Sequence, residues 1–579
     1  MAVIRHLAIE NFRSIKQTQW YPKPGLNCLI GPGDVGKSTL LDAIDLALGA
    51  RRSFQFNDAD FYLMNTDHPI TISVTLGDLS EDLKNLEAYG HFFRGFNQAN
   101  KEIHDEPGPD DGTVITLQLI VREDLDPEWL LYSERAFEFG IEKRLQWKHR
   151  ETISPTRLGA TTHHHLAWGN RSILHKLTED TFDISSSLAQ LNRQTRQNFA
   201  EQPQPELAGL LAQVRSIANN LGVPVGDLKA LLDVKGVSLS NGAISLHNSD
   251  NTPLRQMGTG SSRLLISGLQ KVASTSQITI VDEAEYGLEP YRITRLLHEL
   301  GAKENNPAQQ VFITTHSPYV LRELQAGQLH VLRKPTVNPF APPLPFSHTI
   351  LALNGGDNEQ ATLRACAEAF FSKAVIVGEG STEVGVVRGL DVFYKDNAAP
   401  GFQDRGVAWA EGGGGDNYFK RAEVFSRLGY PTALFKDSDI ATPAHQQQTE
   451  YCRNQGVTIF EWGHNYSTES ATLFGCPLTA IPSIVQLAAT LNGTQEVEQH
   501  ILNCSDNQLT FLSCTKQPND AMRQPLANAA NKYKWFKNIA KAEELARKII
   551  GPEFPNFHEN YRQIISQLYL WAGQNGDQR

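Results

Sequence analysis

The sequence predicts an α/β protein of two or three domains. Its 579 residues exceed the roughly 250–300 residues that a single hydrophobic core normally organises. A glycine-rich phosphate loop near the N-terminus stands between a strand-like run and a helix-like run. Short apolar runs followed by Asp or Glu recur in both halves, which is typical of open sheets that carry functional side chains at their strand ends.

Short apolar runs bounded by polar, Gly or Pro residues mark the expected strands. They are residues 7–9, 26–30, 70–76, 114–121, 278–281, 311–315, 374–377 and 432–435. Helical spacing is present at 40–48 and 293–300, and the last ~50 residues also favour helix. Strands and helices therefore alternate along much of the chain.

Two segments interrupt this alternation and predict the domain boundaries. The stretch from His163 to about Gln213 is polar and helix-leaning, which indicates an inserted helical arm, for which we expect the bounds 161–250. The Pro-rich stretch at 334–346 predicts an extended linker, because each Pro fixes φ and removes a backbone donor. We expect a first domain made of 1–160 and 251–345, and a second domain at 346–579.

Composition excludes several classes of protein. The net charge of −11 argues against non-specific coating of nucleic acid, although it allows a local basic groove. No apolar run approaches the ~18 residues needed to cross a membrane, and the first residues lack a secretion signal. The six cysteines form no C-x-x-C pair and are expected to be reduced. These features predict a cytoplasmic protein without a membrane role.

The segment GPGDVGKST fits the phosphate-loop spacing G-x-x-x-x-G-K-[ST], directly after an expected strand. Backbone N–H groups of such a loop turn toward phosphate oxygens, the Lys provides a point charge, and the Ser hydroxyl can ligate Mg²⁺. A chance glycine-rich turn is the alternative. The predicted residues of this ATP site are Gly31, Gly33, Gly36, Lys37, Ser38 and Thr39.

A second apolar run, ITIV, ends in Asp282 and Glu283. Asp282 would hold Mg²⁺ and Glu283 would polarise the attacking water of ATP hydrolysis. Such an acidic pair is common by itself and gains meaning from the phosphate loop. His316, after the run VFITT, is a candidate contact to the γ-phosphate, while a structural hydrogen-bonding role is its alternative.

The order and spacing of these motifs resemble the ABC-type ATPases of the RecF, Rad50 and SMC group. The opening segment LAIENFRSI at 7–15 resembles their first strand and turn. By this resemblance, Gly258, Gly260 and Ser261 belong to the signature segment, which completes the ATP site of an opposing subunit and implies a dimer formed through the helical insert. The signature is the degenerate G-T-G-S-S, and no coiled-coil arms separate the two ATPase parts, so hydrolysis is expected to be slow.

The second half carries three acidic clusters near expected strand ends. Glu379 and Glu383 occur in VGEGSTEV, and Asp437 and Asp439 in FKDSD, with a glycine-rich turn at 411–420 between them. Hard divalent cations prefer carboxylate oxygens, and two such ions would suit this set. A solvated helix face and a surface turn are the alternatives for each cluster taken singly.

The order of E-G-x-x-E and D-x-D after separate strands resembles a Toprim domain. An ATPase followed by Toprim in one chain is similar to the OLD (overcoming lysogenization defect) family of nucleases, which includes the GajA subunit of the Gabija anti-phage system. The resemblance implies two-metal cleavage of DNA with Mg²⁺, or with Mn²⁺ or Ca²⁺ at the nuclease site. It also implies a further ligand and a catalytic Lys, for which the candidates are Ser467, Glu469 and Lys537, with Lys534 and Lys541 competing for the last role.

Two functions from different classes follow. The first is an ATP-regulated endonuclease or nickase of double-stranded DNA in phage defence, acting as a homodimer or higher oligomer such as a tetramer, with a UvrD-like helicase as one candidate partner. The second is an SMC/RecF-like assembly protein without nuclease activity. A topoisomerase would need a nucleophilic Tyr in a suitable context, which we do not find. The adjacent residues His163, His164 and His165 point to different sides of the chain and favour a surface loop over a metal site.

Overall fold

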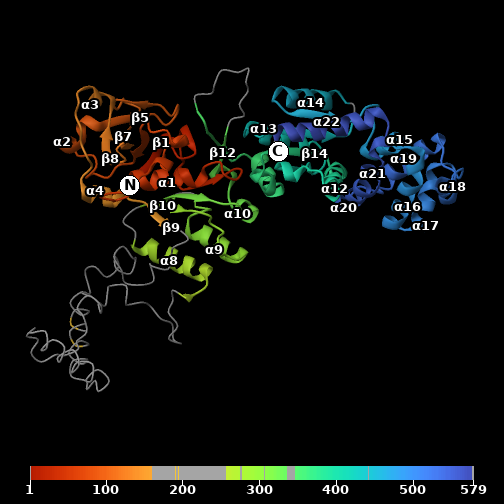
Figure 1. The fold of residues 1–579 in the computed structure, drawn as a ribbon, viewed down its shortest axis with the longest axis horizontal. Coiled ribbons are helices and arrows are strands. Elements are labelled where there is room, and N and C mark those ends of the chain that lie inside the picture. The colour runs from red at the N-terminus through yellow and green to blue at the C-terminus, as the bar shows by residue number, and fades with distance from the viewer. Residues whose placement is uncertain are drawn as a thin grey trace, which may run out of the picture.

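The computed structural model describes residues 2–158, 256–273, 277–304, 307–334, 346–440 and 442–576, together with Gln190 and Gln194. Figure 1 shows the chain extended along one axis, with the N-terminal elements at one end and helices α16 to α19 at the other, while the last helix, α22, returns toward β14. The predicted insert at 161–250, with the three adjacent histidines, and most of the Pro-rich linker lie outside the described residues.

An antiparallel sheet forms the outer layer of the N-terminal half. Its strands follow the order β2-β1-β4-β7-β5-β6, and β8 also pairs with β7. Their bounds are β1 (Val3–Phe12), β2 (Ile15–Trp20), β4 (Ile70–Gly77), β5 (Phe93–Phe96), β6 (Ile103–His104), β7 (Gly112–Val121) and β8 (Pro127–Tyr132). Short helices edge this sheet: α2 (Leu86–Tyr89), α3 (Glu134–Glu138) and α4 (Trp147–Ile153).

A second sheet, mostly parallel, lies beside the first and carries the phosphate loop. Its order is β13-β12-β3-β11-β10-β9, and only β13 runs antiparallel to its neighbour. The strands are β3 (Leu26–Ile30), β9 (Thr156–Leu158), β10 (Ile278–Val281), β11 (Gln310–Thr314), β12 (Leu329–Arg333) and β13 (Thr349–Ala352). The helices are α1 (Lys37–Leu48), α8 (Thr259–Ala273), α9 (Pro290–Glu299) and α10 (Pro318–Glu323).

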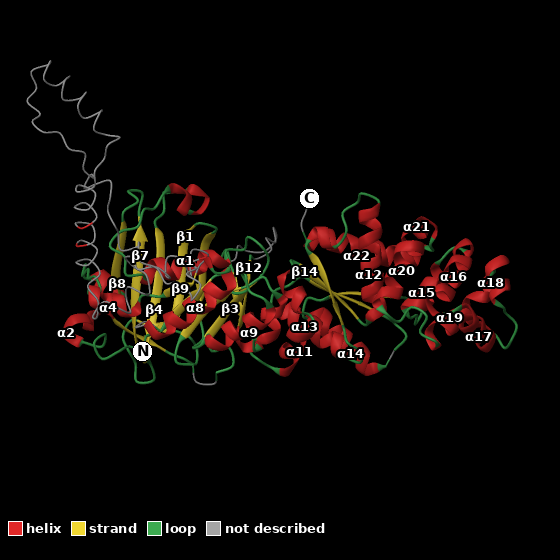
Figure 2. Cartoon of the chain, turned by 90° about the horizontal axis from the view of Figure 1, so that it is seen from below, coloured by secondary structure: helices red, strands yellow, loops and turns green. Residues whose placement is uncertain are grey.

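A four-stranded parallel sheet of order β15-β14-β16-β17 organises the second half (Figure 2). The strands are β14 (Ala374–Gly378), β15 (Val407–Glu411), β16 (Thr432–Lys436) and β17 (Thr458–Glu461). Around it lie α11 (Asp357–Ala365), α12 (Ser381–Asp396), α13 (Asn417–Arg427), α14 (Pro443–Asn454) and α15 (Thr468–Gly475). The central strand β14 is buried along its whole length, as expected for a strand covered on both faces.

Helices complete the C-terminal part, as the spacing of its last residues predicts. They are α16 (Ile481–Asn492), α17 (Thr494–Cys504), α18 (Phe511–Lys516), α19 (Arg523–Lys532), α20 (Ile539–Leu545), α21 (Gly551–Glu553) and α22 (Glu559–Asn575). The last of them returns to the sheet, where Tyr561 stacks on Trp462 with ring centroids 4.7 Å apart. Of the helices that the structure describes, none alone is long and apolar enough to span a membrane, and only the bent pair Thr468–Gly475 and Leu478–Asn492 meets that test together.

The parallel sheets of the two halves share one hydrophobic core. A single buried cluster runs from Cys28 and Val311 in the second sheet to Phe370, Val375 and Phe425 around the third. Helix α10 and the short 3₁₀ segment Ala367–Phe371 meet along this junction, where Arg322 also pairs with Glu368. The two sheets are therefore held by apolar packing.

Each strand predicted from an apolar run is confirmed, and the runs at 26–30 and 278–281 match their strands residue for residue. The predicted linker does not separate two domains, because the strands before and after it belong to the same sheet. The strands β12 and β13 on either side of it pair antiparallel, with Arg333 opposite Thr349. The second sheet thus extends to Ala352, past the position at which the prediction divides the domains.

Helix α12, which carries Glu383, packs against α20 through glycine. A Cβ added at Gly385 would lie 2.5 Å from the Cβ of Ala542 and 2.6 Å from the carbonyl oxygen of Ile539. Backbone cannot yield as a flexible side chain does. This approach therefore fixes the helix that follows Lys537 against the helix that carries Glu383.

We expect Gly385→Ala to lower the free energy of unfolding by about 1–3 kcal/mol, the usual cost of overpacking. Urea unfolding followed by circular dichroism measures this change. Gly463→Ala is the matched control in the same half of the chain, because a Cβ there meets nothing within 4 Å. Equal stabilities of the two variants would contradict the close packing of these helices.

Candidate functional site

The phosphate loop joins the buried strand β3 to α1. Gly36 begins the helix with φ 96°, a left-handed conformation that glycine adopts without strain, and Gly31 has φ 146° with the Leu332 carbonyl 2.4 Å from where a Cβ would stand. Gly33 faces open space. Glycine is thus required at the two ends of the loop by its backbone geometry.

Lys37 is held at the base of this loop and is only 5% exposed. Its Nζ donates to the carbonyl oxygens of Gly31 and Pro32 at 3.0 and 2.8 Å. Burial lowers the pKa of Lys37, while Asp34 and Asp282 oppose that shift. The ammonium is therefore preformed at the position where a phosphate would be held.

The acidic pair follows β10, two strands away from β3 in the same sheet. Ser38 Oγ donates to Asp282 Oδ1 at 3.2 Å, so the structure brings together the two oxygen ligands predicted for Mg²⁺. Glu283 is exposed and has φ 48°, an uncommon conformation for a residue with a side chain. Its N–H donates to Thr314 Oγ1 at 2.9 Å.

The signature segment is anchored to the back of the acidic pair by Arg263. This buried arginine of α8 donates to the carbonyl oxygens of Asp282, Glu283 and Tyr286 at 2.8 to 2.9 Å. A Cβ at Gly260 would lie 2.6 Å from the Gly287 carbonyl, so the segment lies directly on the turn that follows. The sequence analysis missed Arg263, because its three acceptors are backbone carbonyl oxygens, and any residue type could provide them.

The remaining predicted residues of the first half lie around the same strand ends. Ser261 Oγ accepts from Arg292 at 2.9 Å, and Thr39 Oγ1 lies 3.4 Å from Ser14 Oγ. His316 is exposed just past β11, and its backbone N–H donates to Glu285 at 2.7 Å. Its ring stacks on Phe371 of the second half with centroids 6.3 Å apart.

The carboxyl edge of the third sheet gathers a second set of acids. Glu379 follows β14 and Asp437 follows the neighbouring strand β16. The Asp437 N–H donates to Glu379 Oε2 at 3.0 Å, which joins the two strand ends directly. Glu383 enters from the first turn of α12, where its Oε2 accepts from the Gly380 N–H at 2.8 Å.

Thr468, at the start of α15, lies at the centre of these acids. Its Oγ1 is 2.7 Å from Glu383 Oε1 and 2.9 Å from Asp437 Oδ1, and its N–H donates to the same Asp437 oxygen at 2.8 Å. One hydroxyl proton cannot fully satisfy two ionised carboxylates. The arrangement therefore favours a proton or a cation among these acids, and the hydroxyl is a functional group that the sequence analysis missed between Ser467 and Glu469.

Burial and mutual repulsion raise the pKa values of these acids, which favours their protonated form. Burial, followed by the charge of Asp437, raises the pKa of Glu379 to about 7. Burial also raises the pKa of Glu383, and burial together with the charges of Glu383 and Glu469 raises that of Asp437. Like charges at close range disfavour simultaneous ionisation of these acids. A bound divalent cation would offset this repulsion.

The other predicted residues of the second half lie around this centre. Asp439 is exposed, and its charge raises the pKa of both Glu379 and Asp437. Ser467 Oγ instead donates to Asn531 Oδ1 at 2.7 Å. Glu469 is 1% exposed, its Oε1 accepts from Thr382 at 3.4 Å, and its Oε2 is buried without a partner.

The three candidate lysines differ in their surroundings. Burial raises the pKa of Glu469, and the charge of Lys537 is among the influences that oppose this shift. Lys541 Nζ donates to Asn492 Oδ1 at 2.7 Å. Lys534 begins the turn before Lys537 with φ 55°. Of the three, Lys537 is the one whose charge acts on a member of the acidic centre.

The donor chemistry of this centre fits a hard divalent cation, since it consists of carboxylate and hydroxyl oxygens and includes the unpartnered Glu469 Oε2. Within the described ranges, no three His, Cys, Asp or Glu side chains are already arranged around one point as a complete cage. The carboxylates instead bind Thr468 and backbone N–H groups. Side-chain rearrangement is therefore needed for them to ligate one ion together.

Family models divide the chain as its sheets do. Residues 26–322 match the model described as "AAA domain, putative AbiEii toxin, Type IV TA system", and residues 370–439 match the model described as "Overcoming lysogenization defect protein-like, TOPRIM domain". The first match covers just over half of the chain. The second contains Glu379, Glu383, Asp437 and Asp439.

Curated relatives match parts of the chain only. A DNA double-strand break repair Rad50 ATPase from Methanopyrus kandleri is 31% identical over 18% of this chain and 12% of its own length. A DNA replication and repair protein RecF from Shewanella baltica is 36% identical over 14% of this chain and 22% of its own length. The chain thus aligns with less than a quarter of either relative.

Solved structures with similarity to the chain include an SMC head domain from Thermotoga maritima. It is 14% identical, covers 61% of this chain and 99% of its own, and has a TM-score of 0.28. An Smc head domain derived from Pyrococcus furiosus is 13% identical, covers 61% of this chain and 97% of its own, and has a TM-score of 0.33. On the model that covers half of the chain, the protein belongs to the family of the AAA-domain ATPases, and in this chain that ATPase domain precedes a Toprim domain of the overcoming lysogenization defect type.

Proposed function

We propose that the protein is an ATP-regulated, divalent-metal-dependent endonuclease or nickase of double-stranded DNA. The observation that carries this proposal is the set of acids around Thr468, in which the buried Glu383 and the partly buried Glu379 and Asp437 converge from separate elements, and a compensating cation would favour their simultaneous ionisation. Mg²⁺, or Mn²⁺ or Ca²⁺ in its place, would be held there by Glu379, Glu383, Asp437, Asp439 and Glu469, with Ser467 as a more distant ligand.

When bound, the cations would supply Lewis-acid stabilisation and an activated water for phosphodiester hydrolysis. The chain itself would do the positioning. Thr468 keeps Glu383 and Asp437 at a fixed separation, and the buried Glu469 directs an oxygen into the same region. Lys537 would neutralise charge that develops on the phosphate during the reaction.

In the first half, Lys37 and the phosphate loop would hold ATP, Ser38 and Asp282 its Mg²⁺, and Glu283 the attacking water. His316 would contact the γ-phosphate. Gly258, Gly260 and Ser261 would complete the site of a second copy, which makes a homodimer or higher oligomer such as a tetramer part of the proposal. A role in anti-phage defence, and a UvrD-like helicase as partner in a Gabija-type system, extend it further.

The matches to proteins named Rad50 and RecF favour a second candidate function, an ATP-dependent DNA-binding or assembly protein without nuclease activity. The two candidates differ in what the acidic centre does. For an assembly protein, the acids would serve only the structure, and DNA would be retained in the presence of ATP without strand breaks.

We expect purified protein to cut supercoiled plasmid DNA in the presence of Mg²⁺ or Mn²⁺, and Glu379→Ala and Asp437→Ala each to reduce the rate at least about a hundredfold, since each removes a proposed metal ligand. Agarose-gel assays with and without ATP measure this rate. Glu450→Ala, which removes an exposed carboxylate of α14, should cut as the wild type does. Cleavage that survives both ligand variants would exclude this site as the nuclease centre.

Binding of Mn²⁺ should become tighter as pH rises from 6 to 8.5, because the pKa of Glu379 is raised to about 7 and the cation must displace a proton below that pH. An acid with a raised pKa in the folded state binds more protons folded than unfolded, so the metal-free protein loses stability as pH rises from about 4 toward 7. The cation should recover that loss.

Thermal unfolding in EDTA and in Mn²⁺ at both pH values tests this linkage. The increase in Tm caused by Mn²⁺ should be larger at pH 8.5, and it should disappear in the double variant Glu379→Gln and Asp437→Asn. A gain that is independent of pH, or that the double variant retains, would show that Mn²⁺ acts elsewhere.

Arg263→Ala should slow ATP hydrolysis at least about tenfold, which corresponds to about 1.4 kcal/mol of lost positioning. The variant loses the two hydrogen bonds that hold the backbone of Asp282 and Glu283, and a third to the Tyr286 carbonyl, while the phosphate loop stays intact. Binding of ATP should therefore persist. Arg295→Ala, an exposed arginine of α9, is the control, and equal hydrolysis by both variants would contradict this role.

A further inference from the structure

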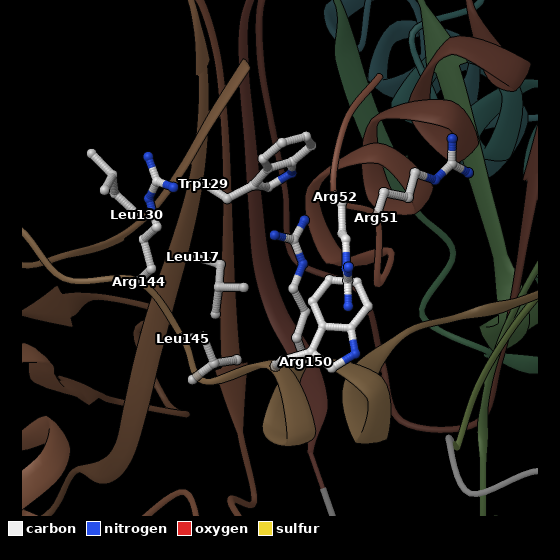
Figure 3. A pocket seen from close by; sticks show the side chains of 9 residues that line it. Arg51, Arg52, Leu117, Trp129, Leu130, Arg144, Leu145 and Arg150 are labelled. Carbon is white, nitrogen blue, oxygen red and sulfur yellow. The ribbon is translucent and has the colours of Figure 1, made fainter. Parts of the chain in front are cut away.

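A cavity of ≈ 250 Å³ opens in the ATPase half, away from the phosphate loop. Strands β7 and β8 form one wall, and the segment after α1 and the start of α4 form the others. Four arginines, two tryptophans and three leucines line it, and the polar and ring-bearing members are Arg51, Arg52, Arg144, Arg150, Trp129 and Trp147. Figure 3 shows Arg150 extending between Trp129 and Arg52.

The lining of this arginine pocket carries positive charge and contains no acidic side chain of its own. Arg51 is paired with Asp45 at 2.6 Å. As far as the structure describes the chain, Arg52, Arg144 and Arg150 have no carboxylate within ion-pair distance. In a protein with a net charge of −11, three unpaired arginines around one cavity are a local exception.

Arg150 is the buried member of this set, with only 8% of its surface exposed. Its Nε donates to the Gly49 carbonyl at 3.0 Å, and its guanidinium lies 4.5 Å from the Trp129 ring centroid. One terminal nitrogen, Nη2, is buried without any hydrogen-bond partner. Burial, followed by the charges of Arg51 and Arg144, lowers the pKa of Arg150 to about 10. An anion in the cavity would accept a hydrogen bond from the unpartnered nitrogen, and it would neutralise the repulsion between the arginines.

The lining selects among anions. Guanidinium groups bind phosphate through paired N–H donors, and they also stack on flat rings. Trp147 is 40% exposed beneath Arg52, and the leucines provide an apolar surface for a base. The volume of ≈ 250 Å³ lies just below the range of about 300–1,000 Å³ that is typical of pockets for drug-sized ligands. The space therefore suits one nucleotide unit.

We propose that the arginine pocket is a second nucleotide site, which binds a nucleoside phosphate, either free or as the terminal unit of a DNA strand. It is separate from the ATP site. Helix α1 begins at Lys37 in the phosphate loop and ends at Leu48, and a helix of this length spans about 18 Å. The pocket lies past its C-terminal end, where Gly49 accepts from Arg150.

The test uses full-length protein with Lys37→Ala, which weakens nucleotide binding at the phosphate loop. Calorimetric titration at low salt with deoxyadenosine monophosphate, inorganic phosphate and a 5′-phosphorylated single-stranded oligonucleotide measures binding. We expect the mononucleotide to bind more tightly than inorganic phosphate. Adding Arg52→Ala and Arg144→Ala should weaken its binding at least about tenfold, since these exposed side chains contribute charge without holding the fold together.

Lys148→Ala is the control, because it removes a positive charge from α4, the helix that carries Trp147 and Arg150, at a position outside the lining. It should bind the mononucleotide as the parent protein does. Competition between the oligonucleotide and the mononucleotide would assign the site to strand ends as well, and its absence would assign it to free nucleotides. Failure of the mononucleotide to bind, an advantage of inorganic phosphate, or equal losses in the arginine and Lys148 variants would overturn the proposal.

Discussion

Parallel pairing of strands that are distant in the sequence is the constraint on which both sites depend. In the second sheet, β11 lies between β3 and β10, so the segments that follow these three strands emerge at one edge. That edge brings Ser38 within hydrogen-bond distance of Asp282, although 244 positions separate them. In the third sheet, the pairing of β14 with β16 does the same for Glu379 and Asp437. A slip in either register would separate the polar groups that the proposed chemistry requires.

Burial at both edges disfavours the charged form of the titratable groups, but their neighbours act differently. Burial lowers the pKa of Lys37, and the surrounding carboxylates oppose that shift while two carbonyl oxygens accept hydrogen bonds from its ammonium. Glu383 and Glu469 are buried beside the partly buried Asp437, and the charges of these acids raise one another's pKa further. The first arrangement is ready for an anionic phosphate. The second is strained until a proton or a cation enters, and such strain is characteristic of sites that bind divalent metals.

Much of the fold and part of the site follow from the sequence, for identifiable physical reasons. Strands such as β3 and β10 are largely buried on both faces, so each is an apolar run with a single polar residue, and such runs are recognisable in the sequence. Charged residues that follow such runs were identified for the same reason. Thr468 escaped notice because a neutral hydroxyl gains its importance only when Glu383 and Asp437 arrive from other elements. The pairing of β12 with β13 was also hidden, since the prolines between them indicate a boundary while the strands beyond restore the sheet.

On the proposed function, a structural change at the ATP site would reach the acidic centre through the junction between the two halves. His316 ends the strand segment at the ATP edge and stacks on Phe371, and α10 follows it at once onto the same surface of the second half. Beneath this contact the two sheets share one apolar core, so neither can rotate freely against the other. On the proposed function, a ligand that moves His316 would therefore act on the segment leading into β14, at whose end Glu379 lies. Regulation of the acidic centre by ATP would then be a matter of small displacements through packed side chains, because close-packed interiors transmit strain and do not absorb it.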